Sequence, residues 1–370
     1  MQLDMFNERE DVALKIKKKK AAAFSGADID AWANDNLTDR IVEGSEAFNY
    51  KDYSVKIVNP ASRYKVASAL QKCIRRGMPE RAVYYAQAIF NSADQSYLWS
   101  RLPVIVLEDV ASGNWEFCAL MMHFSRWAAV RKKTDQIKAL SWLVHELATG
   151  AKSRALCEAV CCAYFIRHDK DPLTNRIGDA MAYLGWKPEE KTNPWLDSPI
   201  QRDRKVVDEQ VAAVTSNPYI LYTYHCGNKK SCAFLNAAVP VVVEMENSEE
   251  LKIINHELPE YTMVAGVPDW SLDKHTRDGI RANKIFLSTN DLLPAWVSPA
   301  AFNRILFQAE TALVDKEATN TELMALKLHA EDIEAESVDV TLERHKELRA
   351  IMATSEFRQG LTDARIKACS

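Results

Sequence analysis

The sequence has no long apolar run that is free of charges. No window approaches the roughly eighteen consecutive apolar residues of a membrane-spanning helix, and the first residues are acidic and basic rather than an apolar signal region. We therefore expect a cytoplasmic chain with no membrane partner. The 8 cysteines lie mostly inside apolar helical stretches, which is typical of reduced thiols rather than of a disulfide framework.

Two catalytic motifs are also missing. No Gly-x-x-x-x-Gly-Lys-Ser/Thr loop is present, so the chain has no backbone cradle for a triphosphate. No Gly-x-Ser-x-Gly elbow is present either, which argues against a serine hydrolase. His225, Cys226 and Cys232 have side chains that suit zinc, but their spacing matches no common zinc module. We expect neither a metal nor another cofactor.

The chain has little excess charge of either sign. The 47 Lys and Arg residues and 51 Asp and Glu residues give a net charge of −4, which argues against coating nucleic acid through the overall field. A partner must then be recognised through local patches. The polar segment 1–45 contains Lys15 and the run 17–20, and we interpret it as a mobile arm or frayed helix. Its lysines either contact phosphate or form a solvated helix face.

Helical periodicity dominates the chain from Ser62 onward. Tyr64, Ala67, Leu70 and Ile74 recur at spacings of three and four, as a helix buried on one side requires. Further helices are predicted at 79–90, 97–110, 115–131, 135–147 and 153–165. The breaks between them are short, which favours antiparallel neighbours. The sequence therefore predicts a mainly α fold, with a helical array over 46–190.

The second half of the chain shows a change of pattern. Three prolines within 186–215 resist regular structure and predict a linker over 191–215. Segments 218–224 and 239–246 are rich in Val, Ile and Tyr, so we expect them to pair as strands in a small α+β domain over 216–312. Charged helices are predicted over 313–370. Four apolar positions there are expected to dock on the body or on a partner subunit: Leu342, Leu348, Ile351 and Met352.

Three ordered pieces of the helical region carry a family resemblance. They are Ser68-Ala69-Leu70 with Lys72, Ala82 with Tyr84, and Arg101-Leu102 with Glu108-Asp109-Val110. This stretch, residues 62–112, resembles the C-terminal helical collar of the MgsA/RarA family of clamp-loader-like AAA+ ATPases, although Ala111 replaces the family's usual glycine. The resemblance implies a homo-oligomerising helical module in DNA replication or repair. It does not imply ATP hydrolysis, because the motor module is absent.

The charged residues of that stretch admit two interpretations. Arg101 and the pair Glu108 and Asp109 flank a buried apolar run, so these charges either pair with one another or with the helix end at Arg75 and Arg76, or they build a polar pocket.

Basic clusters lie near tyrosine and tryptophan residues at three places. They are Arg75-Arg76, Arg131-Lys132-Lys133 and Lys229-Lys230. Cations beside aromatic rings grip phosphate and stack bases, so these clusters are candidate contacts to double-stranded DNA. The alternative is that each cluster is an ordinary solvated helix end, where cations favour the C-terminal dipole.

The segment 266–279 concentrates chemistry-bearing side chains. Asp273 is a candidate carboxylate to stabilise positive charge, His275 an imidazole to move protons, Arg277 a guanidinium to hold phosphate, and Trp270 an aromatic face to stack a base. The order Asp273-x-His275 followed by an arginine is similar to the Asp-x-His segment of helix-hairpin-helix DNA glycosylases, which implies Asp273 as the essential carboxylate. The alternative is a helix start with Ser271 or Asp273 as N-cap.

Two functions therefore follow from the sequence, beside a third option, a structural protein whose helices serve only assembly. The first is a DNA glycosylase or related base-processing enzyme that cleaves the glycosidic bond of a normal or modified base, as in conflict between phage and host. The catalytic residues would be Asp273, His275 and Arg277 in an open hollow. The second is a non-enzymatic, collar-like accessory of DNA replication or repair. It requires nothing of the 266–279 segment.

Overall fold

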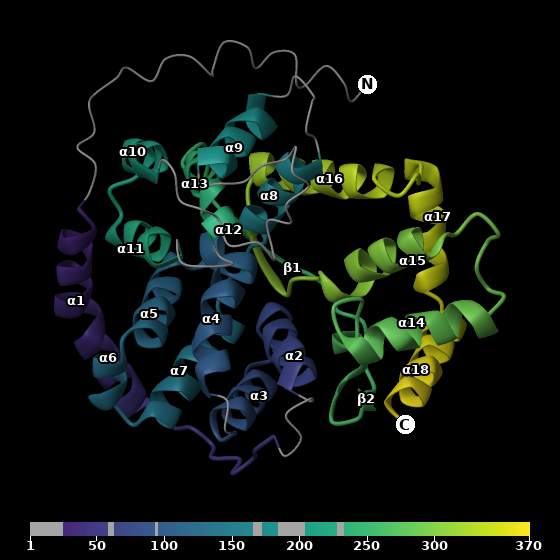
Figure 1. Ribbon diagram of the computed structural model, residues 1–370, viewed down its shortest axis with the longest axis horizontal. Helices are drawn as coiled ribbons and strands as arrows, with labels where there is room; N and C mark the ends of the chain where they lie inside the picture. Colours follow the sequence, from purple (N-terminus) through teal and green to yellow (C-terminus); the bar gives the residue numbers. More distant parts are fainter. Residues whose placement is uncertain (1–24, 58–62, 93–94, 166–171, 184–203, 228–232) are drawn as a thin grey trace.

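The computed structural model describes residues 25–57, 63–92, 95–165, 172–183, 204–227 and 233–370. Within these residues helices predominate and the strands are short, which confirms the mainly α fold class. Figure 1 shows a larger helical array, purple to teal, beside a smaller helical group, green to yellow. In the part of the chain described, no helix has the length and apolar character needed to cross a bilayer.

The predicted helices of the array are confirmed. They are α2 (Arg63–Arg75), α3 (Pro79–Phe90), α4 (Gln95–Asp109), α5 (Trp115–Arg126), α6 (Ala128–Lys132), α7 (Gln136–Thr149) and α8 (Ala155–Phe165). The helix predicted at 115–131 is divided at Trp127, whose backbone is extended. On α2, Ala67, Leu70 and Ile74 are buried as their spacing predicts, whereas Tyr64 is 51% exposed. The buried face of α2 packs against α3, α4 and α7.

The first described helix corrects the prediction of a mobile arm. Helix α1 (Gly26–Ala47) begins at the N-cap Ser25, whose hydroxyl accepts hydrogen bonds from the amides of Ala27 and Asp28. An apolar stripe at helical spacing is buried against the array: Ile29, Ala33, Leu37 and Ile41. This stripe orders the segment despite its many polar residues. The run of lysines at 17–20 lies outside the described residues.

The strands expected at 218–224 and 239–246 are helices instead. They form α11 (Pro218–Gly227) and α13 (Val239–Glu246), next to α12 (Ala233–Ala237) and α9 (Pro172–Tyr183). Val241, Val242 and Val243 are all buried, so packing on every side of the helix outweighs the strand preference of β-branched residues. The predicted linker also needs correction, because 204–214 is helix α10 (Arg204–Val214). Residues 184–203, with their prolines, lie outside the described part.

The strands of the structure lie further along the chain. Strand β1 (Lys252–Asn255) pairs antiparallel with β4 (Lys316–Thr319), and Lys252 lies opposite Thr319. Strands β2 (Met263–Val264) and β3 (Val267–Pro268) form a hairpin. Its two turn residues, Ala265 and Gly266, have φ of 50° and 82°, as a tight turn that follows the strand twist requires. The hairpin leads directly into the short 3-10 helix η6 (Asp269–Ser271).

A second hydrophobic core lies in the smaller group of helices. It is formed by α14 (Arg277–Thr289), α15 (Pro299–Leu306), α17 (Leu342–Met352) and α18 (Ser355–Cys369). The rings of Phe286, Phe302 and Phe357 meet at its centre. Helix α15 continues into a π-helical turn, η7 (Phe307–Thr311), and α16 (Thr321–Glu336) packs on α8 of the array. Leu348 and Met352 are buried, as expected for docking positions, whereas Leu342 is exposed.

Candidate functional site

Asp273 is buried in an ion pair. Its side chain is 4% exposed, and its Oδ2 atom lies 2.8 Å from the Nζ atom of Lys72 on α2. Oδ1 accepts a hydrogen bond from the amide of His275, and Oδ2 lies 3.1 Å from the His275 Nδ1 atom. Burial alone raises the pKa of this carboxyl, but the charge of Lys72 and the hydrogen bond with His275 outweigh burial and hold the pKa well below its usual range. The carboxylate therefore faces a buried cation rather than solvent.

The other two predicted catalytic residues do not share that environment. The His275 side chain is 60% exposed and its ring lies edge-on to Phe307, with centroids 5.1 Å apart. Arg277 is exposed at the first position of α14. The structure thus brings the imidazole to the Asp273 carboxylate, but it does not gather acid, imidazole and guanidinium around an open hollow.

The segment 271–279 has the geometry of a helix start. The N-cap of α14 is Thr276, rather than the predicted Ser271 or Asp273, and its hydroxyl accepts a hydrogen bond from the amide of Gly279. The Asp273 carbonyl accepts hydrogen bonds from the amide and the hydroxyl of Thr276. A Cβ atom at Gly279 would lie 2.0 Å from that same carbonyl oxygen, so the close approach of the two backbones requires glycine there.

Trp270 is enclosed rather than available to a base. It is 1% exposed, the guanidinium of Arg76 lies 4.4 Å from the ring centroid, and Tyr261 packs edge-on at 6.0 Å. The Nε1 atom of Trp270 and the Nε and Nη2 atoms of Arg76 are buried without an acceptor among the described residues. Burial lowers the pKa of Arg76 to about 10, although the charges of Glu310 and Asp269 oppose this.

The charged residues of the collar-like stretch form an internal network. The Asp109 carboxylate is fully buried, and it accepts hydrogen bonds from Arg75 Nε at 2.6 Å, Gln71 Nε2 at 2.7 Å and Arg154 Nη1 at 2.8 Å. Arg101 in turn donates to the Gln71 amide oxygen. Burial raises the pKa of Asp109, but the two arginines outweigh it and lower the pKa overall. These contacts match the ion-pair interpretation rather than the pocket.

The structure does not assemble the described zinc candidates into a metal site, and one predicted basic cluster lies outside the described residues. Lys229, Lys230 and Cys232 lie outside the described residues. His225 lies 3.4 Å from the Asp30 carboxylate and Cys226 lies 3.5 Å from an Arg126 nitrogen. No cluster of three or more metal-ligating side chains occurs in the described ranges.

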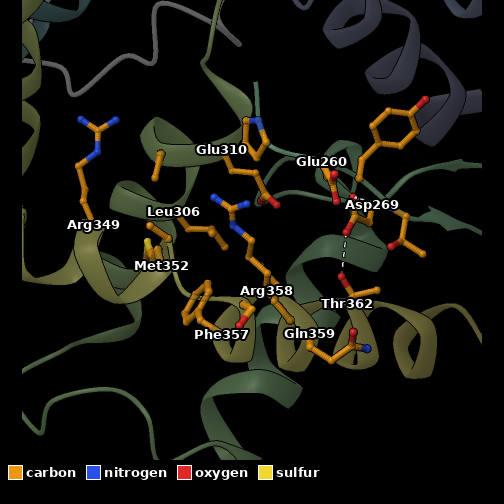
Figure 2. Close-up of a pocket in the computed structure, with 17 residues that line it drawn as sticks. Glu260, Asp269, Leu306, Glu310, Arg349, Met352, Phe357, Arg358, Gln359 and Thr362 are labelled. Carbon is orange, nitrogen blue, oxygen red and sulfur yellow. Dashed lines mark hydrogen bonds between the residues drawn. The ribbon is translucent and has the colours of Figure 1, made fainter. Parts of the chain in front are cut away.

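A cavity of about 510 Å³ lies where the two cores meet. Its walls come from the segment 259–262, the end of α15, η6, η7, α17 and α18, and Figure 2 draws the side chains that line it. Asp269 and Glu310 form its acidic floor, while Arg358 extends across its middle. Glu310 and Arg358 were not predicted, because they belong to charged helical segments that look like solvated faces in the sequence; of the lining residues, only Asp269 lies within the predicted segment 266–279.

The floor of the cavity is held by one buried arginine. Arg365 is 1% exposed and donates two hydrogen bonds to the Glu310 carboxylate, at 2.9 and 2.6 Å. Its Nη1 atom lies 3.7 Å from the Oδ2 atom of Asp269, which accepts a hydrogen bond of 2.9 Å from the Thr362 hydroxyl. Burial raises the pKa of Asp269, the Arg365 charge opposes this, and Glu310 adds to it. The π-helical turn η7 places Glu310 here, and such turns are frequent at functional sites.

Comparison with known proteins identifies no relative. No protein-family model matches the chain, and no curated protein and no solved structure matches it significantly.

Proposed function

We propose that the chain is a non-enzymatic helical accessory of DNA replication or repair, which assembles through its collar-like helices and contacts DNA. One observation carries the proposal: two buried cations of α2, Lys72 and Arg75, are committed to partners inside the chain. Lys72 pairs with Asp273 and Arg75 pairs with Asp109, so α2 ties α4 to the segment that precedes α14. Such contacts serve to fix the position of helices, which is the task of a scaffold.

The glycosylase alternative requires side chains that are buried and paired in this structure. A carboxylate that assists base loss must reach the sugar, whereas Asp273 would first have to leave Lys72. Separating a buried pair of this kind typically costs about 3–5 kcal/mol. Trp270 would also have to leave the Arg76 guanidinium before it could stack on an extruded base. The accessory function needs neither rearrangement.

Support for a DNA contact comes from the exposed start of α2. The guanidinium of Arg63 lies 4.7 Å from the ring centroid of Tyr64 and 5.3 Å from that of Tyr97, and the Tyr64 ring is half exposed. The neighbouring cation on the same helix, Lys65, already has a partner, because its Nζ atom lies 3.5 Å from the Oδ2 atom of Asp278. An arginine beside an exposed aromatic ring pairs with phosphate while the ring stacks on a base.

Solution mass and DNA binding test the proposal. Light scattering after size exclusion is expected to give a mass above that of one chain, and a strict monomer at every concentration contradicts assembly. Fluorescence anisotropy with labelled DNA is expected to show salt-dependent binding that Tyr64→Ala weakens. Tyr183→Ala is the matched control, because Tyr183 is also an exposed tyrosine but lies on α9. Equal loss in both variants contradicts the assigned surface.

Alkali treatment distinguishes the enzymatic alternative. Modified and unmodified duplexes are incubated with the protein, heated in alkali and examined for strand breaks at abasic sites. We expect none. Breaks that disappear in a folded Asp273→Asn variant would replace the accessory proposal with base excision.

A further inference from the structure

The cavity at the junction of the two cores contains one uncommitted cation. Arg358 on α18 extends its guanidinium into the middle of the cavity in Figure 2. Its side chain is exposed and has no hydrogen-bond or ion-pair partner in the described ranges, although the carboxylate of Glu310 also lines the cavity. An arginine held in this way presents several N–H donors to an incoming oxyanion.

The acidic floor does not exclude an anion, because its charge is already balanced. Glu310 is neutralised by the two hydrogen bonds from Arg365. Behind the floor, Arg365 and Arg76 are both buried and both retain N–H groups without an acceptor among the residues described. Their positive charges act on Asp269 and Glu310 from the protein side. The electrostatic cost of an anion beside Arg358 is correspondingly small.

The remaining walls define the rest of the ligand. Leu306, Met352 and Phe357 offer an apolar wall on one side. Across the cavity, the Oδ2 atom of Asp269 accepts one hydrogen bond, from Thr362, and has a second lone pair for a further donor. The exposed carboxylate of Glu260 lies at the same end. A volume of about 510 Å³ falls within the range of small-molecule sites.

We propose that this cavity binds a small organic anion. The phosphate or carboxylate of the ligand pairs with Arg358, its apolar body lies against Leu306, Met352 and Phe357, and an amino or hydroxyl donor reaches Asp269. Nucleoside monophosphates and free amino acids both have this combination of groups. The inference rests on the cavity alone and is independent of the proposed function.

Calorimetry and ligand-observed NMR on the full chain test the site. The probes are adenosine monophosphate and phenylalanine, with adenosine and inorganic phosphate as fragments that lack one half of the chemistry. We expect saturable binding of one complete probe and at least tenfold weaker binding of its fragments, which corresponds to about 1.4 kcal/mol. Binding of adenosine monophosphate identifies a phosphate site, and binding of phenylalanine identifies a carboxylate site. Absence of saturable binding by both probes overturns the proposal.

Substitutions locate the binding. Arg358→Ala is expected to weaken binding at least tenfold, whereas Lys367→Ala, which removes an exposed cation from the same helix without touching the cavity, leaves it unchanged. Glu260→Gln is expected to tighten binding of adenosine monophosphate about twofold to threefold, since it removes a negative charge near this doubly charged anion. Thermal unfolding of each variant confirms that it folds. Binding that is unchanged in both Arg358→Ala and Glu260→Gln places the ligand elsewhere and refutes the assignment.

Discussion

Replacing Asp273 with asparagine isolates the ion pair that joins α2 to the start of α14. The side chains of Lys72 and Asp273 are 5% and 4% exposed, and their charged atoms are 2.8 Å apart. Removing one partner of a buried pair leaves the other charge unpaired, which costs about 3–5 kcal/mol. Lys72 keeps the Ser68 hydroxyl at 2.8 Å and the Ser271 carbonyl at 3.2 Å, so we expect the lower end, ~3 kcal/mol, in the free energy of unfolding.

Urea denaturation at several pH values measures this loss. The folded-state pKa of Asp273 lies below its unfolded value, so its contribution is fully present above the unfolded pKa and is lost as pH falls through the folded pKa. The difference between the parent protein and Asp273→Asn should therefore be largest near neutral pH. It should narrow below about pH 4, where the unfolded carboxyl becomes protonated.

Two controls separate the ion pair from a general loss of charge. Asp278→Asn removes a carboxylate that is 35% exposed and lies 3.5 Å from Lys65, so it should cost less than about 1 kcal/mol. The double replacement Lys72→Met with Asp273→Leu should recover much of the lost stability, because it leaves no buried charge. Equal urea midpoints for the parent, Asp273→Asn and Asp278→Asn would refute the reasoning.

Three other substitutions, at Gly279, Thr276 and Glu246, have expected effects on stability. Gly279→Ala should lower the free energy of unfolding by about 3 kcal/mol in urea titration, because its Cβ would overlap the Asp273 carbonyl; an unchanged midpoint contradicts that overlap. Thr276→Ala should cost about 1 kcal/mol through loss of the N-cap, and the same titration measures it. Burial raises the pKa of Glu246 to about 7 despite the hydrogen bond from Trp115. Its contribution to the free energy of unfolding is therefore fully present below its unfolded pKa and is lost as pH rises through about 7. Glu246→Gln should remove that decline in melting temperature with rising pH. An equal decline in the parent protein and in Glu246→Gln would contradict the role of this carboxyl.

Local periodicity predicted most of the array, and tertiary burial explains where it failed. On α2 the spacing of Ala67, Leu70 and Ile74 defined the helix and its buried face. In α13 the run Val241–Val243 has a strand-like composition, yet burial on all sides makes a helix of it. Nothing within either segment reveals how many neighbours will surround it.

The candidate sites depended on contacts between distant parts of the sequence. The string around Asp273 contains the chemistry of an active site, but its environment is set by Lys72, a residue far away in sequence. The cavity combines Asp269, Glu310 and Arg358 from three separate elements. On a charged helix such as α18, the sequence does not distinguish a cation that lines a cavity, Arg358, from one that faces open solvent, Lys367.

The arrangement of the second core constrains the order of events during synthesis. Phe286 and Phe302 leave the ribosome before the chain turns back through β4 and α16, and their partner Phe357 arrives only with α18. Before α18 is made, Phe286 and Phe302 can stack on each other but lack the contacts of Phe357. Glu310 likewise gains its partner Arg365 only with α18. Helix α18 therefore completes both the aromatic centre of the second core and the ion pair beside the cavity.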